Sequence, residues 1–196
     1  MTVQSCAPSR SVTIARKNYR DYKSELRHDF ARRCGYCDDH DNTFGGVRGF
    51  HIDHFAPKSL FPELELQYSN LIYSCPFCNI AKSNKWFGAN AKTSVVGDMG
   101  FIDPCAPEYS EHLKRNSEGQ IFPATALGRN IIIHLKLYLL RHRLNWQVDR
   151  LQLLSVELAK ISALARSRGI DTQGVDVVFG ELILLTDEYT QRQNDT

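Results

Sequence analysis

Apolar and polar positions alternate with a helical period in the first part of the chain. Over residues 16–32, apolar side chains recur every three or four positions, which predicts an amphipathic helix with a basic outer face. Residues 38–49 are rich in Asp, Asn and Gly and are expected to form a loop. A second helix is expected from Pro76 to about residue 85, because proline is favoured in the first turn of a helix.

Short apolar runs predict strands in the middle of the chain. Residues 50–55 and residues 68–73 are the two candidates that flank a Pro-containing irregular stretch. Residues 101–102 are expected to add a short strand. Residues 112–123 are expected to form a hairpin with Asn and Gly at its tip, residues 116–119.

The last third of the chain has a helical period throughout. It begins at residue 125, is interrupted near residues 135–138, and continues as a long amphipathic helix over residues 139–167. Gly169 is expected to end that helix, and residues 175–192 form the final one. The whole pattern predicts an α+β fold that is mainly helical.

Composition excludes several classes of protein. The chain has 196 residues, of which 42% are hydrophobic and 23% charged, and this excludes a chain that is disordered throughout. No apolar run approaches the roughly 20 residues that cross a bilayer. The first 20 residues are polar and basic, without the apolar core of a signal peptide, so we expect a cytoplasmic protein without a membrane partner.

Charge is unevenly distributed, although the net value is only +2. Residues 1–33 carry a net +5 and residues 79–92 a net +3, whereas residues 34–78 between them carry a net −4. Residues 127–168 carry +6 and residues 169–196 carry −5. An acidic centre between basic segments is typical of a nuclease that holds a cation and phosphates, although each basic helix could equally be a solvated face.

Four of the six cysteines form two Cys-x2-Cys pairs. Cys34 with Cys37 and Cys75 with Cys78 are separated by 37 residues, and each pair is spaced to chelate a metal through a tight turn. In a reducing compartment such pairs are more often metal ligands than disulfides. We therefore expect the four thiolates to hold one structural Zn²⁺ ion, while the remaining cysteines, Cys6 and Cys105, are bystanders.

Between and after these pairs lie Asp53 and His54, then Asn70, then Asn79 directly after Cys78. In this order and at these intervals, the residues resemble the HNH endonuclease family. The third motif position is often His in that family and is Asn79 here, as in its HNN form. The resemblance implies a zinc-bound treble clef with a ββα-metal core, an N-terminal helix and a C-terminal helical extension.

The residue types suit phosphodiester hydrolysis, which needs an activated water and positive charge against the phosphate. A neutral imidazole accepts a proton near pH 7, so His54 is the candidate general base. Asp53 and Asn79 offer hard oxygen ligands, which suit Mg²⁺ or Mn²⁺ better than Zn²⁺. By resemblance, Asn70 belongs to the catalytic motif and fixes the loop that orients the base. It could also be an ordinary turn residue.

Adjacent strand residues face opposite sides, so Asp53 and His54 share one site only if the strand twists or ends there. His51 lies on the side of Asp53 and is a candidate for contacting a nucleic-acid phosphate, for an extra ligand or for strand packing. Lys82 and Lys85 follow Asn79 on the expected helix and are candidates for nucleic-acid binding. Both lysines could instead belong to a solvated helix face.

A wider resemblance extends over most of residues 16–150. The runs "HIDHFAPKSL" from His51 and "FIDPCAPEYSEHL" from Phe101 resemble stand-alone bacterial HNH proteins of Septu (PtuB-like) and retron-associated antiphage defence. That resemblance implies an effector that works with an ABC-type ATPase. We expect the chain to divide into an N-terminal segment at 1–15 that could be flexible, a nuclease core at 16–92, and a hairpin and helical extension at 93–196. The extension could dock the partner, or its long helix at 139–167 could simply complete the core.

Two hypotheses follow for the function. The first is a metal-dependent nuclease that acts on DNA or RNA. The second is a treble-clef module that binds nucleic acid or protein without catalysis. The second would require the cysteines and the basic helices but not Asp53, His54 and Asn79.

Overall fold

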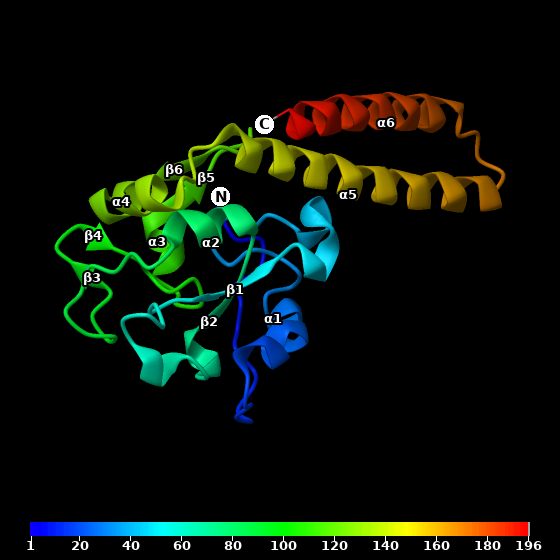
Figure 1. Cartoon of the computed structure of the whole chain (residues 1–196). Coiled ribbons are helices and arrows are strands. Elements are labelled where there is room, and N and C mark those ends of the chain that lie inside the picture. Colours follow the sequence, from blue (N-terminus) through cyan, green and yellow to red (C-terminus); the bar gives the residue numbers. More distant parts are fainter. Residues whose placement is uncertain (196) are drawn as a thin grey trace. The chain divides into compact units, whose positions relative to one another are not determined.

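The computed structural model describes residues 1–195 and has a mixed α and β fold in which about half of the residues are helical (Figure 1). The chain divides into two compact units, Met1–His142 and the residues from Arg143 onward. None of the helices in the described part of the chain is long and apolar enough to span a bilayer.

The first unit holds all of the strands of the described chain and most of its short helices. Its helices are η1 (Tyr19–Tyr22), α1 (Lys23–Asp29), η2 (Asp41–Phe44), η3 (Gly46–Arg48), η4 (Pro62–Leu64), η5 (Tyr68–Asn70), α2 (Pro76–Lys82), α3 (Tyr109–His112) and α4 (Ala126–Leu135). Its strands are β1 (His51–His54), β2 (Leu71–Ser74), β3 (Val95–Val96), β4 (Met99–Gly100), β5 (Leu113–Arg115) and β6 (Ile121–Pro123). The strands pair as three separate two-stranded antiparallel sheets.

The pair of β1 and β2 with the helix that follows is the part of the fold that positions the candidate site. In the register of the pair, His51 lies opposite Ser74 and His54 opposite Leu71. The chain passes from β2 directly into α2, where Cys75 is the N-cap and its Sγ accepts a hydrogen bond from the Cys78 amide at 3.4 Å. Pro76 fills the first helical position, as expected from its fixed φ angle.

The core of the first unit packs around β2. Leu71, Ile72 and Tyr73 are fully buried and belong to the same apolar cluster as Leu26 of α1. The four paired cysteines belong to this cluster too. All four residues of β2 are buried, which explains why this strand is a continuous apolar run rather than an alternating one.

The first fifteen residues are held against the first unit, whereas the sequence analysis expected a flexible segment. Thr2 forms an isolated bridge with Lys114 of β5, and Val3 is buried. The Arg10 guanidinium forms two hydrogen bonds to the Asp103 carboxylate, at 2.8 and 3.0 Å. The compact unit likewise continues to His142, beyond residue 92, where the sequence analysis ended the nuclease core.

Several predicted elements are shorter or displaced. The helix expected over 16–32 begins with η1 at Tyr19 and ends at Asp29, because Ala31 and Arg32 take positive φ angles of 50° and 63° that turn the chain toward Cys34. The prediction of a strand at residues 101–102 is wrong. β3 and β4 pair just before these residues, around a turn at Gly97 (φ +60°), and Phe101 is buried in the core instead.

Other predictions are confirmed. β5 and β6 form the expected hairpin around residues 116–119. The break near residues 135–138 falls after α4, where Lys136 adopts a left-handed conformation with φ 55°.

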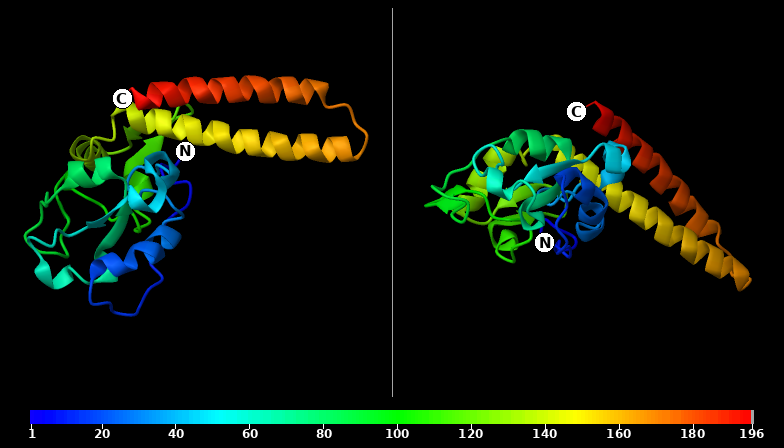
Figure 2. Two further views of the ribbon diagram at one scale, coloured as in Figure 1. Left: turned by 45° about the vertical axis from the view of Figure 1, so that its right-hand side comes forward. Right: turned by 60° about the horizontal axis from the view of Figure 1, so that its bottom comes forward.

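The second unit is a pair of antiparallel helices that lie side by side (Figure 2). α5 (Leu140–Ser167), whose first residues belong to the first unit, and α6 (Gln173–Asn194) are joined by a loop in which Gly169 has φ +70°. At the loop end, the Arg166 guanidinium binds both carboxylate oxygens of Asp176 at 2.7 Å. The two helices predicted for this region are confirmed.

Candidate functional site

Four cysteines from two segments converge in the core of the first unit. Cys34, Cys37, Cys75 and Cys78 are all buried, and their sulfur atoms lie within 4.8 Å of one another. The Sγ atoms of Cys37 and Cys75 are 3.7 Å apart, and all four are free thiols. Sulfurs bound tetrahedrally at 2.3 Å from zinc would lie about 3.8 Å apart. The donor set and its spacing therefore fit one structural Zn²⁺ ion.

Local backbone geometry brings the two cysteine pairs together. After α1 the chain makes a tight turn in which the Asp38 amide donates to the Cys34 carbonyl, and Asp38 itself has φ +66°. The second pair occupies the N-cap and first turn of α2. Burial raises the pKa of the Cys75 thiol to about 11, so zinc binding there must displace a proton.

One face of β1 lies against one face of α2. His51 and Asp53 are two residues apart and so share a face of the strand, while Asn79 and Lys82 are three apart and so share a face of the helix. The Asn79 amide nitrogen Nδ2 forms a hydrogen bond with His51 Nδ1 at 2.9 Å, and the Lys82 ammonium lies 3.3 Å from the Asp53 carboxylate. The layer between strand and helix thus brings Asp53 and Asn79, the predicted ligands of a divalent cation, into one region.

The Asp53 carboxylate is buried and held by two partners. The Tyr36 hydroxyl donates to Oδ2 at 2.6 Å, and the Lys82 ammonium is nearest to the same oxygen. Burial raises the pKa of Asp53, and the attraction of Lys82 opposes that rise. Both contacts are made through Oδ2, which leaves Oδ1 as the oxygen able to accept a further ligand.

Lys82 does not lie where the sequence analysis expected it. Its side chain is 0% exposed, and its ammonium donates to the His54 carbonyl at 2.8 Å in addition to pairing with Asp53. The prediction that Lys82 contacts a nucleic-acid phosphate is therefore corrected, because a group enclosed in this way has no access to a phosphate. Lys82 instead supplies the buried counter-charge of Asp53.

Asn79 and His51 form the second pair in the layer. The Asn79 amide nitrogen contacts His51 Nδ1, so the amide oxygen is left for a ligand. Burial and the charge of Lys23 lower the pKa of His51, which favours the neutral imidazole. Carboxylate and amide oxygens are the donors that Mg²⁺ and Mn²⁺ prefer, so the donor types of Asp53 and Asn79 suit a divalent cation. Asn79 lines the neighbouring cavity, whereas Asp53 does not.

His54 lies on the opposite face of β1. Its Nε2 is 3.0 Å from the Glu65 carbonyl oxygen, and its ring packs edge-on to Tyr19 at 4.8 Å between centroids. A carbonyl oxygen can only accept, so Nε2 carries the proton and Nδ1 keeps its lone pair. Burial lowers the pKa of His54 and so favours the neutral ring that a general base requires.

Asn70 clamps the loop that follows β1. Its Oδ1 accepts from the Ala56 amide at 2.8 Å, and its Nδ2 donates to the Ala56 carbonyl at 2.9 Å and to the Leu64 carbonyl at 3.3 Å. Leu64 directly precedes Glu65, whose carbonyl holds the His54 ring. Asn70 therefore contacts backbone alone in this network and acts as a positioning residue.

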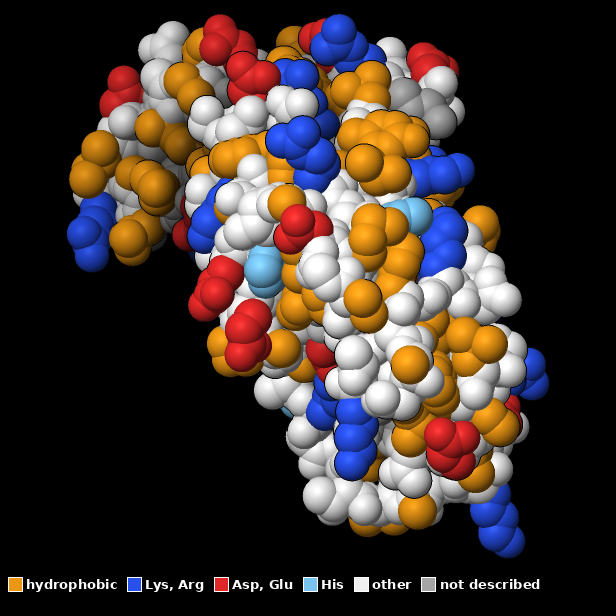
Figure 3. Space-filling view, turned by 90° about the vertical axis from the view of Figure 1, so that its left-hand side faces the viewer, with side chains coloured by type: hydrophobic (Ala, Val, Ile, Leu, Met, Phe, Trp, Pro, Cys, Tyr) orange, Lys and Arg blue, Asp and Glu red, His pale blue; other side chains and the backbone are white. Residues whose placement is uncertain are grey.

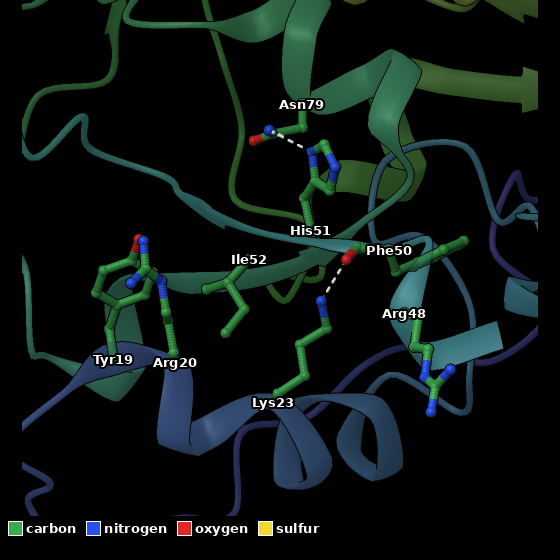
Figure 4. A pocket seen from close by; sticks show the side chains of 8 residues that line it. All are labelled: Tyr19, Arg20, Lys23, Arg48, Phe50, His51, Ile52 and Asn79. Atoms are coloured by element: carbon green, nitrogen blue, oxygen red, sulfur yellow. Dashed lines mark hydrogen bonds between the residues drawn. The ribbon is translucent and has the colours of Figure 1, made fainter. Parts of the chain in front are cut away.

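A cavity of about 500 Å³ opens beside this layer (Figure 4). Figure 4 shows His51 pointing from β1 toward Asn79, whereas Ile52 points the other way, toward side chains of η1 and α1. Arg20, Lys23 and Arg48 line the cavity, and no carboxylate does. Burial lowers the pKa of Lys23, and the Lys23 ammonium already donates a hydrogen bond to the Phe50 carbonyl. Arg20 and Arg48 are therefore the cations more available to bind an anion in the cavity.

Sequence reasoning missed most of this cavity. Arg20 and Lys23 belong to the basic helix that was predicted, but nothing in the pattern indicated that this helix would face His51. Tyr36 was missed too, and its place between two zinc-knuckle cysteines was the available signal.

Lys85 donates to the carbonyls of Ala81 and His134, so its ammonium joins α2 to α4.

A second buried pair lies close to the cysteine cluster. His142 Nδ1 is 2.9 Å from the Asp39 carboxylate, and both side chains are 1% exposed. His142 therefore belongs to the core of the first unit. The contact joins the start of α5 to the segment that follows Cys37, and so supports the zinc knuckle.

These features define a small domain with a ββα arrangement, a four-cysteine cluster that is compatible with zinc, and a histidine at the end of β1. Residues 34–85 match the family model of the HNH endonuclease, from the first zinc-knuckle cysteine to Lys85. The match supports the HNH family for this segment, and with it a nuclease function in general and the use of divalent metals. No curated protein matches the chain.

Proposed function

We propose that this protein is a metal-dependent endonuclease that hydrolyses phosphodiester bonds of nucleic acid, with His54 as the general base. The contact of His54 Nε2 with the Glu65 carbonyl carries the proposal. It holds the ring in the tautomer whose Nδ1 can take a proton from water, and Asn70 keeps the loop that supplies this carbonyl in place. In solution a histidine would sample both tautomers and many ring orientations, so this contact prepares the base before substrate binds.

The cationic cavity beside β1 is the proposed seat of the phosphate backbone. Arg20 and Arg48 offer guanidinium groups, which bind phosphate oxygens with charge-assisted hydrogen bonds. His51 lines the same cavity and remains a proposed nucleic-acid contact. On the face drawn in Figure 3, Lys and Arg side chains occupy scattered positions rather than one continuous patch.

Two metals belong to the proposal. A structural Zn²⁺ ion on the four cysteines would fix the start of α2 and thus the position of Asn79. Asp53 and Asn79 would hold a catalytic Mg²⁺ or Mn²⁺ ion, which when bound supplies positive charge against the phosphate and the leaving oxygen. Tyr36 and Lys82 would keep the Asp53 carboxylate oriented through its other oxygen.

The test is cleavage of supercoiled plasmid DNA and of total RNA by the purified chain with Mg²⁺, with Mn²⁺ or with EDTA. The variant is His54→Ala, and the matched control is His28→Ala, because the His28 side chain is 89% exposed. We expect a loss of at least 100-fold in rate for His54→Ala and no change for His28→Ala. Zinc content and circular dichroism should match the wild type in both variants.

Cleavage by His54→Ala at the wild-type rate would show that the base is another group. No cleavage of either substrate by the wild type, with binding retained, would favour a treble-clef binding module. DNA and RNA are compared directly because metal-assisted hydrolysis serves both, and the rates decide between them.

The biological setting is proposed on sequence resemblance alone. The likeness of residues 51–60 and 101–113 to Septu and retron-associated proteins supports a cytoplasmic effector of antiphage defence that works with an ABC-type ATPase. Copurification with an ATPase encoded beside the gene, and loss of phage protection with His54→Ala, would support this setting. Undiminished protection with the variant would contradict it.

A further inference from the structure

Many large aliphatic side chains lie on the outside of the second unit. Ten of those on its two helices are at least 40% exposed, and Leu184 reaches 71%. The ten are Leu153, Leu154, Val156, Ile161, Leu164, Val177, Val178, Ile183, Leu184 and Leu185. Single exposed aliphatic residues are common, but a cluster of this size on two adjacent helices indicates a surface that is covered by another molecule.

The seam between α5 and α6 combines polar contacts with half-buried apolar side chains such as Leu158 and Phe179. Asn145 contacts Gln193, and the Ser162 hydroxyl donates to Asp176 at 2.9 Å, so the two contacts define one antiparallel register. Ser155 lies seven residues before Ser162 and is therefore on the same side of α5. A two-helix hairpin that leaves many aliphatic side chains exposed gains stability from further packing.

Four of the aliphatic residues form one face of the hairpin. Thr186 lies seven residues before Gln193 and Phe179 seven before Thr186, so both face the seam. Each member of the face directly precedes a residue of the seam, namely Ser155 or Ser162 on α5 and Phe179 or Thr186 on α6. Successive side chains of a helix are turned by 100°, so in an antiparallel pair all of these preceding residues point to the same side. The members are Leu154, Ile161, Val178 and Leu185, 40–56% exposed, and we call them the aliphatic face.

The opposite side of the hairpin has a different character. The residues that directly follow the same seam positions are Val156, Ala163, Gly180 and Asp187. Only Val156 among them is a large aliphatic residue, and Asp187 is charged. The members of the aliphatic face on each helix are also seven residues apart, which is the spacing of helices that pack against other helices. Only one side of the hairpin is therefore suited to apolar packing.

Charge indicates which molecule covers the face. α5 carries five Lys or Arg residues against two acidic ones, whereas α6 carries one Arg against four acidic ones. A second copy, rotated by 180° about an axis parallel to the helices, places its α6 over α5 and its α5 over α6. Every neighbouring pair of helices is then antiparallel and opposite in charge, as in an antiparallel four-helix bundle.

We propose that two copies of this chain associate through the aliphatic face and form such a four-helix bundle. The interface would extend beyond the four residues of the aliphatic face along the whole hairpin. α6 has 22 residues and is about 33 Å long. A hairpin side of that length and two helices wide, about 20 Å with helix axes 8–10 Å apart, covers about 600 Å² per copy. The roughly 1,200 Å² buried in total lies at the lower limit of specific interfaces.

The test is the mass of the full-length, zinc-loaded protein in solution, measured by sedimentation equilibrium between about 1 and 100 µM. We expect the wild type to reach twice the chain mass of 22.4 kDa. Leu154→Glu and Leu185→Glu should each weaken the dimer at least tenfold, because a charge enters the apolar centre of the bundle. Val156→Glu is the matched control, at 52% exposure on the other side of the hairpin, and should leave the dissociation constant unchanged.

Circular dichroism of each variant shows whether the helices are retained, and a variant that loses helicity is replaced by Leu154→Gln or Leu185→Gln. A monomer at 100 µM would overturn the proposal. So would a dimer that Val156→Glu weakens as much as Leu154→Glu does. If the wild type is monomeric and the glutamate variants lose a different protein that copurifies with it, the face belongs to that partner instead and self-association is refuted.

Discussion

Replacement of Lys82 by Met tests whether this lysine is the buried counter-charge of Asp53. Met has nearly the same length and is apolar, so the substitution removes the ammonium while it preserves most of the packing. The change leaves the Asp53 carboxylate with the Tyr36 hydroxyl as its remaining contact. It also removes the hydrogen bond to the His54 carbonyl.

The magnitude follows from the 3.3 Å between the Lys82 ammonium and the Asp53 carboxylate. Coulomb's law with an effective dielectric constant of about 20 gives about 5 kcal/mol at that separation. The loss of one partner of a buried pair costs about 3–5 kcal/mol, because the other charge is left without compensation. We therefore expect Lys82→Met to lower the free energy of unfolding by about 3–5 kcal/mol at pH 7.5.

The assay is urea unfolding of the zinc-loaded protein, followed by circular dichroism. Lys85→Met is the control: it removes a lysine that lies just after the end of α2 and whose ammonium contacts backbone carbonyls. It should cost about 1 kcal/mol or less. The double variant Asp53→Asn/Lys82→Met should be more stable than Lys82→Met alone, because the uncompensated charge is gone. Equal losses for Lys82→Met and Lys85→Met, or no recovery in the double variant, would refute the buried pair.

Three further predictions concern the zinc centre, the base and the clamp. Cys75→Ser, or removal of zinc by a strong chelator, should unfold the first unit as judged by circular dichroism, because structural zinc contributes directly to folding; a folded zinc-free protein would contradict this. The cleavage rate should fall at acid pH, because a protonated His54 accepts no proton. Since burial lowers the pKa of His54, the fall should begin below the pH at which an unburied histidine titrates. A rate that rises as the pH falls below that point would exclude this base. Asn70→Ala should lower the free energy of unfolding by about 2–4 kcal/mol, and should reduce kcat more than it raises KM; a change in KM alone would indicate that Asn70 contacts substrate.

The sequence by itself determined the parts of this protein that depend on local pattern and on residue chemistry. Two Cys-x2-Cys pairs indicated a four-thiolate cluster, because a pair at that spacing chelates through its own turn. Helical periodicity located α4, α5 and α6 to within a few residues, since long amphipathic segments carry strong signals. The order of Asp53, His54, Asn70 and Asn79 indicated a nuclease motif before any geometry was known.

Only the tertiary structure decided which side chains meet. The sequence pattern placed Lys82 on a helix face beside phosphates, but the packing of β1 against α2 encloses it with Asp53. The Glu65 carbonyl that selects the tautomer of His54 belongs to an irregular loop, where no periodicity predicts its direction. Arg20 and Arg48 line the cavity from segments with no motif of their own. The position of Tyr36 between two cysteines did not indicate that its hydroxyl would reach Asp53. Contacts of this kind depend on the arrangement of segments far apart in the chain, which is set by packing of the whole unit rather than by local preference.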